Sequence, residues 1–199
     1  MSNFLGSLHF EMSKIKVNSE LLQLMDDYNL FMDSAKKIDT PLNVSKVKGN
    51  HRSSLYEEVD LISEENFGET SLVCEVRDKN KYNYSFQILT DSIKNRVISR
   101  FDEGNGTHKN NCDDIPLAEQ MVTTPHFHRY DEKGRFIAYK TYELKQLGTT
   151  PIKIADGFKS FCSHLNISCN NNIEPTIEVV EAGALPLEFD NDPLNGINF

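Results

Sequence analysis

The spacing of apolar residues along the chain changes once, near Pro41. Before that point apolar side chains recur every three or four residues, at Leu21, Leu24, Tyr28, Phe31 and Ala35. This period predicts an amphipathic helix over residues 19–35, and Asn18 or Ser19 is suited to cap its N-terminus.

After Pro41 the apolar residues come in short runs that are rich in β-branched and aromatic side chains, at 42–47, 55–62, 71–77, 82–89 and 93–101. Polar turn segments separate these runs, which is typical of an antiparallel sheet. In the run 82–89, Tyr84, Phe86 and Ile88 alternate with polar residues. One side of this strand is therefore expected to face the core and the other to face water.

A second helix is predicted over residues 156–166, where Phe158, Phe161 and Leu165 follow helical spacing. We therefore expect a single α+β domain over residues 18–182, in which an antiparallel β-sheet of about five to seven strands packs with an N-terminal helix and a C-terminal helix. Residues 1–17 are expected to form an N-terminal extension, and residues 183–199 an acidic, poorly ordered tail.

Composition limits the classes of protein that the chain can represent. With 199 residues, 38% of them hydrophobic, it is long enough to bury one core. No run approaches the roughly 18 apolar residues of a membrane-spanning helix, and the first residues lack the features of a signal peptide. The four cysteines do not have the spacing of a disulfide framework. These features predict a cytoplasmic protein with free thiols and no membrane partner.

The net charge of −9 is unevenly distributed. Residues 77–100 contain six basic side chains and two acidic ones, whereas residues 173–199 contain six acids and no Lys or Arg. The overall negative field opposes binding of duplex DNA, but the local basic segment can hold a small anion such as a phosphate or nucleotide.

The strongest chemical signal is a predicted hairpin that begins at Pro125. On a strand, His126, His128 and Tyr130 point to the same side, and two imidazoles with a phenol are poor material for an apolar core. If the turn holds two or four residues, these side chains lie across from Arg135, Ile137 and Tyr139. A three-residue bulged turn exchanges those partners.

The preceding strand and loop carry Arg96, Arg100, Asp102 and His108. If this segment neighbours the hairpin, His108, His126 and His128 with Tyr130 form a candidate catalytic group. Arg96, Arg100 and Arg135 are then candidates for binding an anion, and Asp102 can orient an imidazole. Cleavage of a phosphodiester without a metal uses these residue types, with His as acid and base and Arg against the phosphate.

Zinc is the alternative at this site. His108, Cys112, His126 and His128 offer four ligands of suitable chemistry. The prediction adopted from the residues is a site with no metal and no other cofactor.

The segments 100–110 and 125–130 together resemble an uncharacterised family of bacterial and phage proteins, described only as a domain of unknown function. The likeness rests on an Arg-x-Asp, a Gly…His-x-Asn loop and a Pro-His-x-His-x-Tyr hairpin followed by an Ala-Tyr pair, and it spans roughly residues 55–168. The resemblance implies a shared site that includes Asn110 as a second orienting residue. It also implies a home on phage or mobile genomes, and no particular reaction.

Two main functions of different classes follow from these features, and a metal-dependent hydrolase is a third. In the first, the protein is a phage, mobile-element or defence-related protein that binds or cleaves a phosphodiester in a nucleotide or single-stranded RNA, as a metal-independent, ribonuclease-like hydrolase. In the second, it is a non-enzymatic inhibitor whose acidic surface imitates nucleic acid and binds a basic protein partner.

Overall fold

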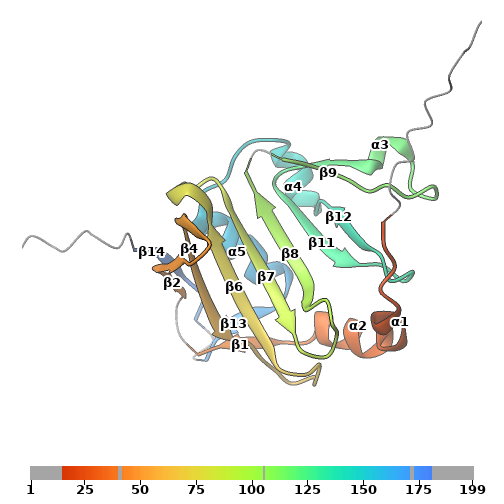
Figure 1. Ribbon diagram of the computed structural model, residues 1–199, viewed down its shortest axis with the longest axis horizontal. Coiled ribbons are helices and arrows are strands. Elements are labelled where there is room, and N and C mark those ends of the chain that lie inside the picture. The colour runs from red at the N-terminus through yellow and green to blue at the C-terminus, as the bar shows by residue number, and fades with distance from the viewer. Residues whose placement is uncertain (1–14, 40–41, 105, 171–172, 181–199) are drawn as a thin grey trace, which may run out of the picture.

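A twisted seven-stranded antiparallel sheet forms the middle of the molecule (Figure 1). The computed structural model describes residues 15–39, 42–104, 106–170 and 173–180. Along the sheet, the strands lie in the order β12 (Phe136–Tyr139), β11 (His126–Tyr130), β8 (Val97–Glu103), β7 (Tyr84–Thr90), β6 (Thr70–Val76), β4 (His51–Asp60) and β3 (Lys46–Lys48). The predicted α+β class is therefore confirmed, whereas residues 1–14 of the predicted extension and the predicted tail lie outside the described residues.

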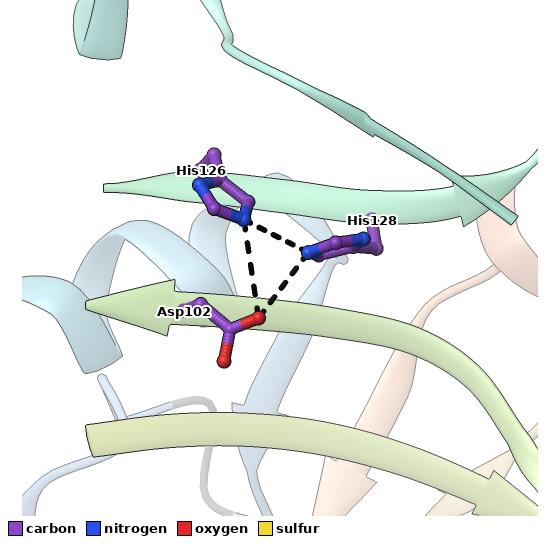
Figure 2. Close-up of side chains that lie close together, drawn as sticks. All are labelled: Asp102, His126 and His128. Atoms are coloured by element: carbon purple, nitrogen blue, oxygen red, sulfur yellow. Dashed lines mark hydrogen bonds and ion pairs between the residues drawn. The ribbon is translucent and has the colours of Figure 1, made fainter. Parts of the chain in front are cut away.

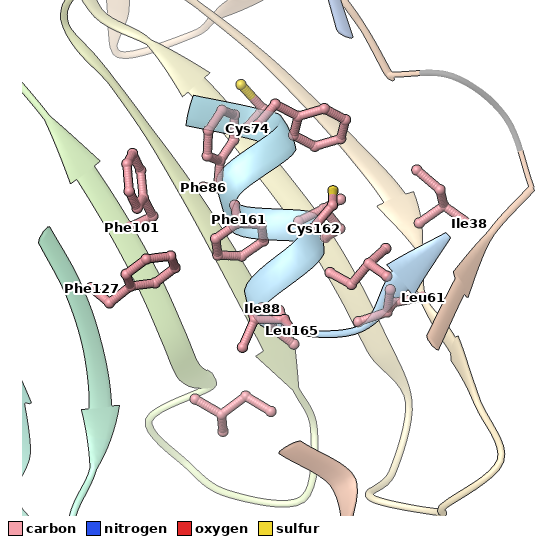
Figure 3. Packing of buried hydrophobic residues seen from close by; sticks show 14 of the residues in the cluster. Ile38, Leu61, Cys74, Phe86, Ile88, Phe101, Phe127, Phe161, Cys162 and Leu165 are labelled. Carbon is pink, nitrogen blue, oxygen red and sulfur yellow. The ribbon is translucent and has the colours of Figure 1, made fainter. Parts of the chain in front are cut away.

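One face of the sheet is covered by helix α5 (Ile154–His164), which matches the predicted C-terminal helix (Figures 1 and 3). Phe158 and Phe161 of α5 pack on Phe86 of β7, with ring centroids 5.2 and 5.4 Å apart. The ring of Phe127 on β11 lies nearly parallel to that of Phe161, with centroids 6.2 Å apart. The alternating aromatic residues of the strands thus face α5 and form the core, as period-two patterning requires.

Helix α5 approaches the sheet closely because it carries Gly157 where it crosses β7. A Cβ atom added at Gly157 would lie 2.0 Å from the hydroxyl oxygen of Tyr84. That hydroxyl donates to the carbonyl oxygens of Ile152 and Lys153, just before the helix. A side chain at position 157 would force the helix and the sheet apart.

The predicted N-terminal helix is observed as two short helices, α1 (Ser19–Gln23) and α2 (Met25–Asp33). Asn18 caps α1, and its side chain accepts the amide hydrogens of Glu20 and Leu21. In α2, the hydroxyl of Tyr28 donates to the carbonyl of Ile98 and accepts the amide hydrogen of Tyr130. These bonds attach the N-terminal helices to the end of the sheet where β8 begins and β11 ends.

Short strands complete the domain at its edges. They form the pairings β1 (Lys36–Ile38) with β5 (Ile62–Ser63) and β13 (Ile167–Cys169), β2 (Leu42–Val44) with β14 (Ile177–Val179), and β9 (Thr107–Lys109) with β10 (Met121–Thr123). Of two further helices, α3 (Leu117–Gln120) lies between β9 and β10, and α4 (Tyr142–Leu147) follows β12. The polar segment 102–115 contains the end of β8 and all of β9.

A buried lysine joins two helix C-termini next to β1. The ammonium group of Lys36 donates to the carbonyl oxygens of Met32, Ser34 and Leu165, and the side chain is fully buried. Met32 and Leu165 stand at the ends of α2 and α5, where carbonyl groups lack helical partners and favour a cation. Lys36 thus connects the two helices.

Within the described residues, every helix is too short or too polar to traverse a lipid bilayer.

Candidate functional site

The centre of the candidate site is formed by two neighbouring strands, β8 and β11. Their antiparallel register places His126 opposite Asp102 and His128 opposite Arg100. The intervening residues Phe101 and Phe127 point into the core against α5. His126, His128 and Asp102 therefore lie on the sheet face opposite α5, and Figure 2 shows the two imidazoles and the carboxylate turned toward one another.

Three atoms converge at this centre. The Nε2 atoms of His126 and His128 are 2.9 Å apart. The Oδ2 atom of Asp102 is 3.2 Å from Nε2 of His128 and 3.9 Å from Nε2 of His126. Both histidines are almost fully buried, with relative exposures of 3% and 5%. The predicted common face of the two histidines is confirmed, and Asp102 joins them.

Arg100 fixes the orientation of the Asp102 carboxylate. Its Nε and Nη2 atoms both donate to Oδ1 of Asp102, at 2.9 and 2.7 Å. The other carboxylate oxygen, Oδ2, is thereby directed at the histidines. Arg77 also approaches this carboxylate, with its Nη2 atom 3.8 Å from the same Oδ1.

Burial and charge shift the protonation equilibria of these groups in known directions. Burial alone would raise the pKa of Asp102, but the hydrogen bond from His128 and the charge of Arg100 outweigh it and lower the pKa to about 2. Burial, followed by the proximity of His128, lowers the pKa of His126 to about 4. At neutral pH the carboxylate is therefore charged and the His126 imidazole is neutral.

His108 reaches the same centre from β9. Its ring meets that of His128 edge-on, with centroids 4.7 Å apart, and lies 6.2 Å from that of His126. Burial and then His128 lower its pKa. Among the described residues, no hydrogen-bond partner is found for its buried Nε2 atom. The expected approach of His108 to the hairpin histidines is confirmed.

A polar cleft of about 640 Å³ opens above these side chains. Besides the histidines, Arg100 and Asp102, its walls include side chains that the sequence analysis did not single out, namely Arg77, Asn80, Tyr82, Asn83, Thr107 and Thr124. From the sequence, Arg77 was considered only as part of the basic segment 77–100. The strands β6 and β8 run in the same direction with β7 between them, so the residues that follow β6 meet the end of β8.

Two of the predicted anion-binding arginines lie outside this cleft. Arg135 is part of the turn between β11 and β12, where its guanidinium pairs with Asp131 and Asp114, both at 2.5 Å. Arg96 lies between β7 and β8 and donates to the carbonyl of Thr90. The predicted role of Arg135 assumed a shorter turn, but Tyr130 pairs with Phe136, so five residues form the connection.

Tyr130 and Asn110 also occupy positions other than those expected. Tyr130 shares the face of the histidines, but its buried ring packs on Phe136 and Tyr28, and its hydroxyl accepts from the side chains of Asn18 and Asn95. Asn110 forms two hydrogen bonds with the backbone of Ala138 in β12. Tyr130 thus contacts the N-terminal helix, and Asn110 holds β12 in place.

Of the four ligands considered for zinc from the sequence, only His126 and His128 belong to the group of donor atoms that converge in the described chain, and His108 and Cys112 do not. Cys112 is buried near Arg135 and Asp114, and it does not line the cleft. The potential metal ligands that lie within 4.8 Å of one another in the described chain are instead Asp102, His126 and His128. The carboxylate was expected only to orient a histidine.

Comparisons with models of protein families, with curated proteins and with solved structures found no match. The resemblance to an uncharacterised bacterial and phage family therefore stays a prediction.

Proposed function

We propose that the cleft binds and hydrolyses a phosphodiester, in a nucleotide or in single-stranded RNA. The observation that carries this proposal is the meeting of two arginines and three histidines around one carboxylate, in a chain whose net charge is −9. The partly exposed guanidinium groups of Arg77 and Arg100 can attract a small anion, although the carboxylates of Asp102 and Glu103 line the same cleft, while the negative net charge of the chain repels long duplexes.

Arg77 is the side chain best suited to a phosphate. Its side chain is 36% exposed, and within the described residues its guanidinium forms no hydrogen bond, only the 3.8 Å contact with Asp102. Arg100 is partly exposed as well and keeps N–H groups that do not point at Asp102. Two guanidinium groups at one cleft match the oxygen atoms of a phosphodiester.

Tyr82 supports a nucleotide rather than inorganic phosphate as the ligand. It lines the cleft and is 42% exposed. An exposed aromatic ring next to arginines is a platform on which a base can stack, an interaction worth about 1–3 kcal/mol per base. The cleft volume also lies within the range of about 300–1,000 Å³ that is typical of ligand pockets.

The reaction proposed is hydrolysis. The oxygen of a water molecule forms a bond to phosphorus, the bond from phosphorus to the ester oxygen breaks, and the proton lost by the water ends on the leaving oxygen. Arg77 and Arg100 stabilise the charge on the phosphoryl oxygens.

The test measures hydrolysis of bis(p-nitrophenyl) phosphate and of the dinucleotide UpU by the full chain. We expect Arg77→Met to lower kcat/KM about 10- to 100-fold, which corresponds to one charge-assisted hydrogen bond. Arg52→Met is the matched control, because Arg52 is exposed on β4 and does not line the cleft. Wild-type protein that neither hydrolyses nor saturably binds either ester would overturn the proposal.

A second pair of variants tests the contact with the base. Tyr82→Ala is expected to weaken binding of UpU about 5- to 100-fold and to leave binding of inorganic phosphate unchanged. Tyr142→Ala is the control, because Tyr142 is 72% exposed on α4, away from the cleft. Equal effects of the two substitutions would exclude Tyr82 as a base platform.

The acidic-inhibitor alternative rests mainly on the segment 173–199. Of its acids, Glu174 pairs with Lys159, and most of the others lie outside the described residues. Within the part of the chain that the structure describes, no contact favours this alternative over the cleft.

A further inference from the structure

The hydrogen-bonding capacity of the His126, His128 and Asp102 centre does not match its geometry. A neutral imidazole nitrogen either carries a proton or presents a lone pair. If Nε2 of His128 donates to Asp102, it has no lone pair for Nε2 of His126, 2.9 Å away. If it accepts from His126, it has no proton for Asp102. At best, one proton on Nε2 of His128 is shared between Oδ2 of Asp102 and Nε2 of His126, so the two buried contacts are never both full hydrogen bonds.

We infer that Asp102, His126 and His128 bind a divalent transition-metal cation. All three atoms can present lone pairs to one cation at the same time. The triangle formed by Nε2 of His126, Nε2 of His128 and Oδ2 of Asp102 has a circumradius of about 2.0 Å, so one point lies at about the length of a zinc–nitrogen bond from each atom.

The ligand types narrow the choice of cation. Two imidazoles and one carboxylate suit zinc or ferrous iron, whereas magnesium and calcium prefer oxygen ligands. Three protein ligands leave coordination positions free for water or substrate, as in catalytic zinc sites. The free positions can face the cleft, since the three residues line it together with Arg77 and His108.

Arg100 serves as a positioning residue for this cation. It binds Oδ1 of Asp102 through two nitrogen atoms and so presents Oδ2 to the histidines. Partners of this kind typically contribute 10- to 100-fold to metal affinity. The inference replaces the expectation, drawn from the sequence, of a site without metal.

The chemical role that we assign to the cation rests on the proposed function. A bound zinc ion lowers the pKa of its water to about 7, which supplies hydroxide at neutral pH. The hydroxide oxygen bonds to phosphorus as the ester bond breaks, and the leaving oxygen takes a proton from solvent. Occupancy of the site by a cation needs no phosphodiester.

The experiment titrates chelator-treated full-length protein with zinc in a calorimeter, and with cobalt(II) while its visible absorption is recorded. We expect one high-affinity site with an absorption spectrum of mixed nitrogen and oxygen ligands, and no comparable binding of magnesium. Asp102→Asn and His128→Ala should each weaken zinc binding at least about 100-fold, and Arg100→Met about 10- to 100-fold.

Controls separate the site from other zinc ligands and from loss of fold. His51→Ala and Cys169→Ser remove an exposed histidine and a partly exposed thiol elsewhere, and should retain wild-type affinity. Circular dichroism verifies that each variant is folded. If His128→Ala is unfolded, the isosteric Asp102→Asn substitution decides. Zinc binding that is absent from the wild type, or equal in Asp102→Asn and wild type, would overturn the inference.

The assays also distinguish failure of this inference from failure of the proposed function. If zinc binds at the three residues while neither ester is bound or hydrolysed, the inferred cation site stands and the proposed phosphodiester function is wrong. If zinc-free, chelator-treated protein hydrolyses the esters at the full rate, the proposed function stands and the inference of a bound cation is wrong.

Discussion

The imidazole rings of His126 and His128 converge, with centroids 4.7 Å apart and Nε2 atoms 2.9 Å apart. Residues two apart on a strand are separated by roughly 7 Å along the backbone. Alternation on the strand therefore explains why both side chains share a face, but not why their rings tilt toward a common point. Both rings tilt toward Oδ2 of Asp102, which lies 3.9 Å from Nε2 of His126 and 3.2 Å from Nε2 of His128.

Replacement of Gly157 by alanine is expected to destabilise the fold by about 1–3 kcal/mol. The new methyl group would collide with the buried hydroxyl of Tyr84. This cost should exceed the gain of about 1 kcal/mol in helix propensity. Urea unfolding provides the measurement, with Gly49→Ala as control because a Cβ at Gly49 has no neighbour within 4 Å. Equal stability of both variants would show that α5 tolerates a greater distance from the sheet.

Asn110→Ala should lower the free energy of unfolding by about 2–4 kcal/mol, because it leaves the buried N–H and C=O of Ala138 without their side-chain partners. Asn66→Ala, which removes one exposed hydrogen bond to Gly68, should change it by no more than about 0.5 kcal/mol. Thermal or urea denaturation checks both values. Folded Asn110→Ala protein should keep its zinc affinity; a loss of affinity without a loss of stability would restore Asn110 to the site.

Lys36 should make stability depend on pH in the alkaline range. Burial, partly opposed by Asp33, lowers its pKa from 10.5 to about 8 in the folded protein. Between these values the unfolded chain binds more protons, so the contribution of Lys36 rises from pH 8 to 10.5 and is lost as the pH falls through 8. Relative to Lys36→Met, wild-type protein should gain on the order of 2–3 kcal/mol over this window. A constant difference in urea unfolding would contradict the assignment.

Arg135→Met should leave ester hydrolysis unchanged, in contrast to Arg77→Met. The guanidinium of Arg135 is engaged by Asp131 and Asp114 in the hairpin turn and lies outside the cleft. A parallel assay of the two variants against bis(p-nitrophenyl) phosphate checks this. A loss of kcat/KM in Arg135→Met comparable to that in Arg77→Met would return Arg135 to the anion site.

The parts of the site that could be predicted are those fixed by local periodicity. The strand alternation of His126 and His128 follows from neighbouring positions in the sequence. Asp102 and His108 were expected near them only on the condition that their segment adjoins the hairpin, and the pairing of β8 with β11 fulfils it. The fold class followed similarly from the change of period near Pro41.

The parts that could not be predicted depend on turn length and strand order. Arg135 was assigned a cross-strand position, but a five-residue connection moves it into the turn. Tyr130 shares the face of His128, yet that face continues from the cleft to the N-terminal helices, where Tyr28 meets it. Arg77 belongs to a different strand end, and only the order β6-β7-β8 brings it to Asp102.

The most direct test is an anomalous diffraction measurement at the zinc absorption edge, on crystals of the full chain grown with zinc and a phosphorothioate dinucleotide that resists hydrolysis. The account predicts a zinc peak at about 2.0–2.2 Å from Nε2 of His126, Nε2 of His128 and an oxygen of Asp102, with a phosphorothioate oxygen in contact with Arg77. Zinc bound only elsewhere on the protein, or a dinucleotide bound away from this cleft, would contradict it.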